Sequence, residues 1–113
     1  MENDDGEPAL NLKLLERVNE LYRAALDEAP RAREWLARKG VTDARAVERF
    51  GIGFAPGTLK EVLPRDGSVR KELRGLGLLE GPGRGRETLA GCIVVPLLDA
   101  MGKIVELVGY PLG

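Results

Sequence analysis

Two arginines in a glycine-rich segment are the residues of this sequence whose type and spacing best suit a chemical task. Arg84 and Arg86 lie within Gly81–Arg86, a run in which glycine alternates with proline or arginine. A basic loop can contact phosphate, because phosphate binding requires positive charge rather than one fixed geometry. The alternative is a plain hairpin or connector loop, since glycine and proline also dominate ordinary turns. The segment is therefore a candidate phosphate contact.

Most familiar catalytic machinery is excluded by residues that the sequence lacks. The chain contains no histidine and one cysteine, Cys92. A Ser-His-Asp triad, a histidine zinc ligand and a cysteine-rich metal site are therefore ruled out. Asp99 is interpreted as a turn cap rather than a catalytic carboxylate, and Cys92 as a small buried apolar residue. We expect no catalytic residue, metal site or cofactor in this segment.

Basic residues are concentrated in the middle of the chain. The net charge is −1, from 17 Lys+Arg and 18 Asp+Glu, yet residues 31–86 hold 13 basic and 7 acidic residues. A local basic excess attracts polyanions even when the whole chain is nearly neutral. The alternative is a set of solvated helix faces, which is the usual place of lysine and arginine. Trp35, in the same region, is interpreted as a core residue rather than a base-stacking platform.

Length and composition indicate one globular domain. With 113 residues, 43% hydrophobic and 31% charged, the chain suits a single core. We expect a disordered acidic tail over 1–10 and a single domain over 11–113. No apolar run is long enough to span a membrane, the N-terminus lacks a secretory signal, and a lone cysteine suits a reducing compartment. These features predict a cytoplasmic protein.

The elements that must position these residues differ between the two halves of the chain. Helical spacing of apolar residues predicts helices over 12–29, 31–39 and about 43–50. After Gly51 we expect a short extended segment whose glycines allow a close approach to another part of the backbone. Two brief helices should follow, beginning after Thr58 and after Ser68. A β-hairpin is predicted over 92–98 and 104–108. Pro96 requires an edge or a bulge, because it cannot donate a ladder hydrogen bond. The predicted fold class is α+β, with N-terminal helices packed on a small antiparallel sheet that ends in the hairpin.

The two strands of this hairpin are apolar on both faces, so that a partner surface around Val95, Leu97, Val105 and Leu107 is expected. That surface would suit another domain or a second copy of the chain, which makes a homodimer through the hairpin one possibility.

Five segments, in order and spacing, carry a resemblance to a known family. They are Ala32–Val41, Arg49–Pro56, Leu76–Leu79, Ile93–Val105 and Gly109–Gly113. This series resembles the N-terminal part of the catalytic core of bacterial DnaG-type DNA primases, the region that precedes the TOPRIM domain. There an aromatic-Leu-x-x-(Arg/Lys)-Gly helix end is followed by Phe-x-Ile-Gly-(Phe/Tyr)-Ala, by Gly-(Leu/Met)-Leu and by a Pro-containing hairpin. The stretch Leu89–Cys92 is more similar to primase-like proteins of mobile elements.

The resemblance implies an α+β subdomain that helps form the groove for a single-stranded DNA template and that packs on the TOPRIM domain of the same parent chain. It implies that the parent is a nucleotidyltransferase that makes RNA primers, with magnesium in the TOPRIM domain, zinc in an upstream module, and contact with a replicative helicase. The segment alone would not be an enzyme.

The sequence departs from the family where nucleic acid is contacted. Arginines that the family carries before the Pro-containing strand are replaced by Ala90 and Cys92, and a later arginine by Tyr110. Arg84, Arg86 and Lys103 could substitute for them as phosphate contacts, and Tyr110 could stack on a base. These four residues are the predicted nucleic-acid contacts. The alternative function is a non-catalytic interaction or self-association domain.

Overall fold

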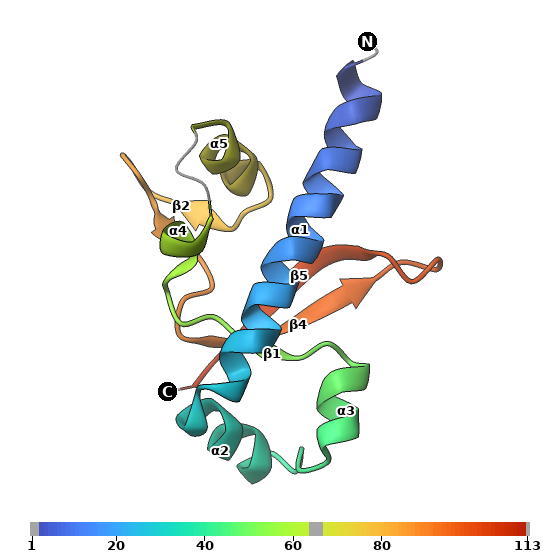
Figure 1. Cartoon of the computed structure of the whole chain (residues 1–113), viewed down its shortest axis with the longest axis vertical. Helices are drawn as coiled ribbons and strands as arrows, with labels where there is room; N and C mark the ends of the chain where they lie inside the picture. The colour runs from blue at the N-terminus through green and yellow to red at the C-terminus, as the bar shows by residue number, and fades with distance from the viewer. Residues whose placement is uncertain (1–2, 64–66, 113) are drawn as a thin grey trace.

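The computed structural model describes residues 3–63 and 67–112 and has the predicted α+β class (Figure 1). Five helices and five strands make up this part of the chain. In chain order they are α1 (Asn3–Asp27), α2 (Pro30–Arg38), α3 (Ala44–Arg49), β1 (Gly53–Phe54), α4 (Leu59–Val62), α5 (Gly67–Gly75), β2 (Leu79–Glu80), β3 (Arg86–Glu87), β4 (Cys92–Leu98) and β5 (Ile104–Pro111).

The long helix α1 is the element on which the rest of the fold packs. Its apolar stripe, Leu15, Val18, Tyr22 and Leu26, is almost fully buried, as the helical spacing predicted. The helix begins at Asn3 rather than at the predicted Leu12, so it occupies most of the segment expected to be a tail over 1–10. Once a helix is nucleated by its packed part, each added residue gains one hydrogen bond, and extension costs little. Residues 1–2 of that segment lie outside the described residues.

The three-stranded antiparallel sheet has the order β1-β4-β5, with β4 in the centre. Strand β1 is short and pairs only Gly53 with Val94 and Phe54 with Ile93, whereas β5 pairs along the whole of β4. The core is built on both faces of β4. Val94 packs with Leu15 and Val18 of α1, while Ile93, on the opposite face, packs with a second cluster that includes Leu36 of α2.

Pro96 lies on the part of β4 that has a paired strand on one side only. The carbonyl of Cys92 accepts a hydrogen bond from the Ala55 N–H at 3.0 Å, on the β1 side of the strand. Because antiparallel strands bond through alternate residues, Pro96 presents its nitrogen to that same side. The pairing with β1 ends at Val94, so the missing N–H removes no ladder bond. Of the two predicted alternatives, an edge or a bulge, Pro96 takes an edge-like position, because β4 is unpaired on that side although it is the central strand.

Gly53 marks a close approach between β1 and α1. A Cβ at this position would lie 2.6 Å from the carbonyl carbon of Tyr22, inside the backbone of the helix. Only glycine lets the strand lie so close to the helix, because any side chain would collide with backbone that cannot move aside. The predicted role of the glycines in this segment is confirmed here.

The β4–β5 hairpin extends beyond the helices and ends in a tight turn (Figure 1). At this turn Asp99 accepts hydrogen bonds from the backbone N–H groups of Met101, at 2.8 Å, and Lys103, at 2.9 Å. The predicted turn-capping role of Asp99 is confirmed. Within the described chain, no helix combines the length and the apolar character that crossing a membrane requires.

The apolar surface predicted on this hairpin is displaced toward its tip. Leu97 and Val105 are exposed, but Val95 is half-buried and Leu107 is buried. Leu107 belongs to the core because it lies opposite Pro96 and packs in the cluster that covers α1. Leu98 and Met101 complete the exposed set, which we call the hairpin tip: Leu97, Leu98, Met101 and Val105.

Candidate nucleic-acid interface

The loop that carries Arg84 is held in place by two other basic side chains. Arg74 of α5 donates from Nη1 to the carbonyl oxygen of Gly81, at 2.6 Å, and from Nη2 to that of Gly83, at 2.7 Å. Lys60 of α4 donates from Nζ to the carbonyl oxygen of Gly85 at 2.8 Å. The loop is therefore fixed at three carbonyl groups rather than free.

The glycines of this loop make that arrangement possible. Gly83 and Gly85 have φ angles of +66° and +80°, which residues with a Cβ rarely adopt. In addition, a Cβ on Gly85 would lie 2.9 Å from Nη2 of Arg74. Glycine is thus required both for the turn and for the approach of the arginine. The alternation of glycine with other residues in the sequence reflects this turn.

Arg84 and Arg86 are both presented to solvent by the β2–β3 hairpin. Arg86 pairs with Glu80 across the hairpin, and its Nη2 lies 3.8 Å from Glu80 Oε2 while 81% of its side chain is exposed. Such exposed ion pairs are weak, so the Arg86 guanidinium is available to another anion. Arg84 is exposed as well. The two predicted arginine contacts therefore lie together on one small lobe formed by α4, α5, β2 and β3.

The other two predicted contacts lie elsewhere. Lys103 is exposed at the turn of the β4–β5 hairpin, and Tyr110 lies toward the other end of β5, opposite Ile93. In Figure 1 the hairpin turn and the lobe with β2 are on opposite sides of α1. Tyr110 is 48% exposed, so its ring is accessible for stacking. The four residues do not form one cluster.

A buried carboxylate joins the lobe to the body of the protein. The Tyr22 hydroxyl donates to Oε2 of Glu87 at 2.5 Å, and the backbone N–H of Leu59 donates to Oε1 at 2.9 Å. Glu87 thereby links β3 to α1 and to the start of α4. Burial, together with the hydrogen bond to Glu87, raises the pKa of Tyr22, so the phenol remains protonated. This joint positions the hairpin that carries the arginines.

Sequence reasoning missed Lys60, Arg70 and Arg74, which surround the same loop. Their signal was present in the basic excess of the central region and in the spacing of Arg70 and Arg74, four residues apart on one helix. Nothing in the sequence showed that α4 and α5 would bring them to the Gly81–Arg86 loop. The basic character of the lobe therefore exceeds what the two predicted arginines supply.

Trp35 lies at the edge of the core. It is half-buried against the cluster formed by Leu36, Ile52 and their neighbours, and Lys39 Nζ lies 5.4 Å from the centre of its ring. The lysine therefore occupies one face of the indole through a cation–π contact. This supports the predicted packing role.

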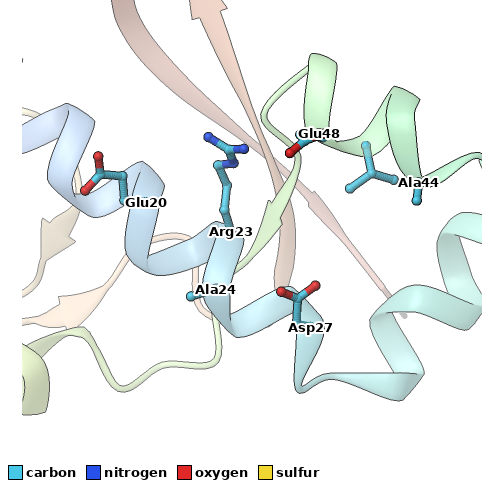
Figure 2. Close-up of a pocket in the computed structure, with 7 residues that line it drawn as sticks. Glu20, Arg23, Ala24, Asp27, Ala44 and Glu48 are labelled. Carbon is cyan, nitrogen blue, oxygen red and sulfur yellow. The ribbon is translucent and has the colours of Figure 1, made fainter.

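A separate hollow lies between α1 and α3, and its charge is unsuited to a polyanion. Figure 2 shows Glu20, Arg23 and Asp27 on α1 with Glu48 of α3 facing them. Three carboxylates against one arginine would repel phosphate. In the described segments, no three potential ligand side chains lie close enough together to hold a metal ion.

The two positions before the Pro-containing strand at which the resemblance led us to expect arginine are not basic in this fold. Ala90 is exposed and Cys92 half-buried, and burial raises the pKa of the Cys92 thiol, which is therefore neutral. Positive charge is instead provided by the lobe.

The fold of this chain is similar to part of several solved protein structures. The fold superposes on a DnaG primase catalytic domain with a TM-score of 0.87, at 23% identity, over 96% of this chain and 37% of that one. It also superposes on the RNA polymerase domain of the Mycobacterium tuberculosis primase DnaG with a TM-score of 0.78, at 29% identity, over 93% of this chain and 36% of that one. The chain thus has the fold of one part of a primase catalytic core.

Sequence comparison leads to the same family. The chain is 29% identical to the DNA primase of Haemophilus influenzae over 119 residues, which is 95% of this chain and 20% of that protein. No family model matches the chain. It is similar, over nearly its whole length, to a DnaG-type primase region, as the five segments indicated. The chain spans about a fifth of the length of this curated relative.

Proposed function

We propose that this chain serves as the N-terminal subdomain of a DNA primase catalytic core and binds the single-stranded DNA template through its basic lobe. The observation that carries the proposal is the pair of exposed arginines, Arg84 and Arg86, on a loop fixed by Arg74 and Lys60, within a primase catalytic-core fold. The similar catalytic domain with the TM-score of 0.87 is described as bound to single-stranded DNA.

The physical basis of binding is electrostatic. Cations that neutralise backbone phosphates release condensed counterions, and this release favours binding at low salt. A fixed loop loses less conformational freedom on binding than a free one, because its ordering has already taken place in folding. Lys103 lies at the turn of the β4–β5 hairpin, on the other side of α1 from the lobe, and Tyr110 lies toward the opposite end of β5. Because neither residue adjoins Arg84 and Arg86, we assign the primary contacts to the lobe.

The parent enzyme and its other parts belong to the same proposal. In it the chain acts as a scaffold for a TOPRIM domain, which would carry magnesium and the primer-synthesis chemistry of a nucleotidyltransferase, with zinc in an upstream module and contact with a replicative helicase. The exposed apolar side chains of the hairpin tip support a packing role, because an apolar patch of this kind marks an interaction surface.

Template binding is tested by fluorescence anisotropy of a labelled oligo-dT strand titrated with the chain at several salt concentrations. We expect weak binding that declines steeply with salt. Replacement of both Arg84 and Arg86 by glutamine should lower the slope of log K against log salt by about 1.4, because each phosphate contact on a single strand contributes about 0.7. The matched control is Arg17→Gln with Arg45→Gln, two exposed arginines on α1 and α3. Equal slopes in the two double variants would refute the lobe as the DNA contact.

A second candidate function is self-association through the hairpin tip. The exposed fractions of Leu98 (57%) and Met101 (83%) are high for apolar residues, which favours a partner surface. Sedimentation velocity over a wide concentration range tests it. A dimer that is lost in Leu98→Lys would support this function, and a monomer at all concentrations would exclude it.

A further inference from the structure

A hollow on the basic lobe brings together cations from three separate segments. It has a volume of about 360 Å³, and its lining includes Lys60 of α4, Arg70 of α5 and Arg84 of the loop. Two buried leucines, Leu63 and Leu73, form part of its wall. Its size falls within the range of small-ligand pockets. The hollow is therefore large enough to take a phosphorylated group.

The charges around this hollow are not neutralised from within. One acidic residue, Glu61, accompanies the three cations in the lining. In the part of the chain that the structure describes, no ion pair is found for Arg70 or Arg84. Arg70 is only partly exposed, so its guanidinium is less screened by water than those of fully exposed arginines. An anion in the hollow would therefore gain from converging, unpaired positive charge.

One of these cations, Lys60, and the loop that carries another, Arg84, are held in position before any ligand arrives. Lys60 is anchored by its bond to the Gly85 carbonyl, and the bonds from Arg74 to Gly81 and Gly83 fix the loop on which Arg84 stands. A flat guanidinium with several donors suits the oxygens of a phosphate. Positions fixed in the free protein reduce the entropy lost on binding.

We propose that this hollow is a phosphoryl-group site, in which Arg70, Arg84 and Lys60 bind the oxygens of one phosphate. The phosphate comes from a DNA strand or from a free phosphorylated molecule; in the first case, the inference rests on the proposed function. The site adds Lys60 of α4 and Arg70 of α5 to the phosphate contact proposed for Arg84 of the loop.

The test is an NMR titration of the ¹⁵N-labelled chain with inorganic pyrophosphate at constant ionic strength, and separately with an oligo-dT strand without terminal phosphates. Pyrophosphate should saturably shift the backbone amide signals of Leu73 and Gly85 and the Nε signals of Arg70 and Arg84. Arg70→Gln should weaken this binding about tenfold, the scale of one lost charge-assisted hydrogen bond. Arg70→Lys should restore most of it. The matched control is Lys71→Gln, which removes one charge from the next residue of α5, outside the hollow.

The outcomes separate the two proposals. If both probes shift the signals of the hollow, the site takes a strand phosphate. If pyrophosphate alone does so, the site takes a free phosphorylated ligand, and the anisotropy titration decides separately whether the chain binds template. Oligo-dT binding that leaves these signals unmoved, with no effect of pyrophosphate, would overturn the site and leave the proposed function intact. Equal weakening of pyrophosphate binding in Arg70→Gln and Lys71→Gln would also overturn the site, because this result would show only a general effect of charge.

A melting temperature of Arg70→Gln equal to that of the parent chain confirms that the variant is folded.

Discussion

The hydroxyl of Tyr22, on α1, donates to the carboxylate of Glu87, on β3, across 65 positions of sequence and entirely within the protein interior. The other carboxylate oxygen accepts from the backbone of Leu59. Glu87 is only 8% exposed, and a buried carboxylate is tolerated when its oxygens are hydrogen-bonded. This contact makes the orientation of the basic lobe depend on the main helix.

The first prediction concerns the stability of this joint. Tyr22→Phe keeps the ring but removes the donor, so Oε2 of Glu87 is left buried without this partner. We expect a loss of about 1–3 kcal/mol in the free energy of unfolding, measured by urea denaturation. Phe54→Tyr serves as the control, because it makes the reverse change and adds a hydroxyl group to a half-buried ring. An unchanged urea midpoint in Tyr22→Phe would show that the bond contributes nothing.

The second prediction concerns alkaline pH. The pKa of Tyr22 lies above its ordinary value of 10.0 in the folded chain, mainly because of burial. Above that pH the unfolded chain loses the phenolic proton while the folded chain retains it, so stability falls as pH rises. The contribution is fully present below pH 10.0 and decreases above it by about 1.4 kcal/mol per pH unit.

The measurement compares the urea midpoints of the parent chain and Tyr22→Phe between neutral pH and strongly alkaline pH. Other groups titrate in both proteins, so the difference between them isolates Tyr22. The two curves should converge as the pH rises. Parallel curves would mean that the hydroxyl titrates equally in the folded and unfolded chains.

The third prediction concerns the approach of β1 to α1. Gly53→Ala places a methyl group 2.6 Å from the Tyr22 carbonyl carbon, and the strand must move away. A loss of about 1–3 kcal/mol is expected, as for other overpacked positions. Gly67→Ala, at the start of α5 with nothing within 4 Å of the added Cβ, should be neutral or slightly stabilising. Similar denaturation midpoints for the two alanine variants would refute the close contact.

The fourth prediction concerns the loop clamp. Arg74→Lys keeps the charge but cannot bridge two carbonyl groups with a planar fork. The amides of Gly83 and Arg84 should then show lower NMR order parameters, because the bonds to Gly81 and Gly83 are lost. If template binding follows the proposal, oligo-dT affinity should fall with net charge unchanged. Lys71→Arg, on the same helix, controls for an exchange of basic residues, and equal order parameters in the two variants would disprove the clamp.

Local patterns in the sequence predicted the elements that depend on neighbouring residues. The stripe from Leu15 to Leu26, the β4–β5 hairpin and the Asp99 turn follow from spacing and turn chemistry. The start of α1 was missed because polar residues near a helix end carry no apolar spacing. The burial of Leu107 was missed because the first strand of the hairpin is apolar throughout and the second nearly so, so the face that meets α1 could not be distinguished.

The candidate site was predictable only in part. Arg84 and Arg86 were visible as cations in a glycine-rich run, but the partners that fix this run, Arg74 and Lys60, bind backbone carbonyls. Such bonds depend on where a folded loop points its oxygens, which residue types do not reveal. The separation of Lys103 from the arginines, and the contact of Tyr22 with Glu87, likewise depend on the tertiary path of the chain.

Pro96 has a consequence for association between molecules. An open stretch of strand is a template on which a foreign chain can add itself by backbone pairing, the first step toward disordered aggregates. On the side of β4 where the pairing with β1 has ended, the ring of Pro96, which lies close to Gly51, takes the place of the amide that such a chain would need. The pairing with β1 can therefore stop part-way along the central strand without presenting a backbone donor at Pro96 to another molecule.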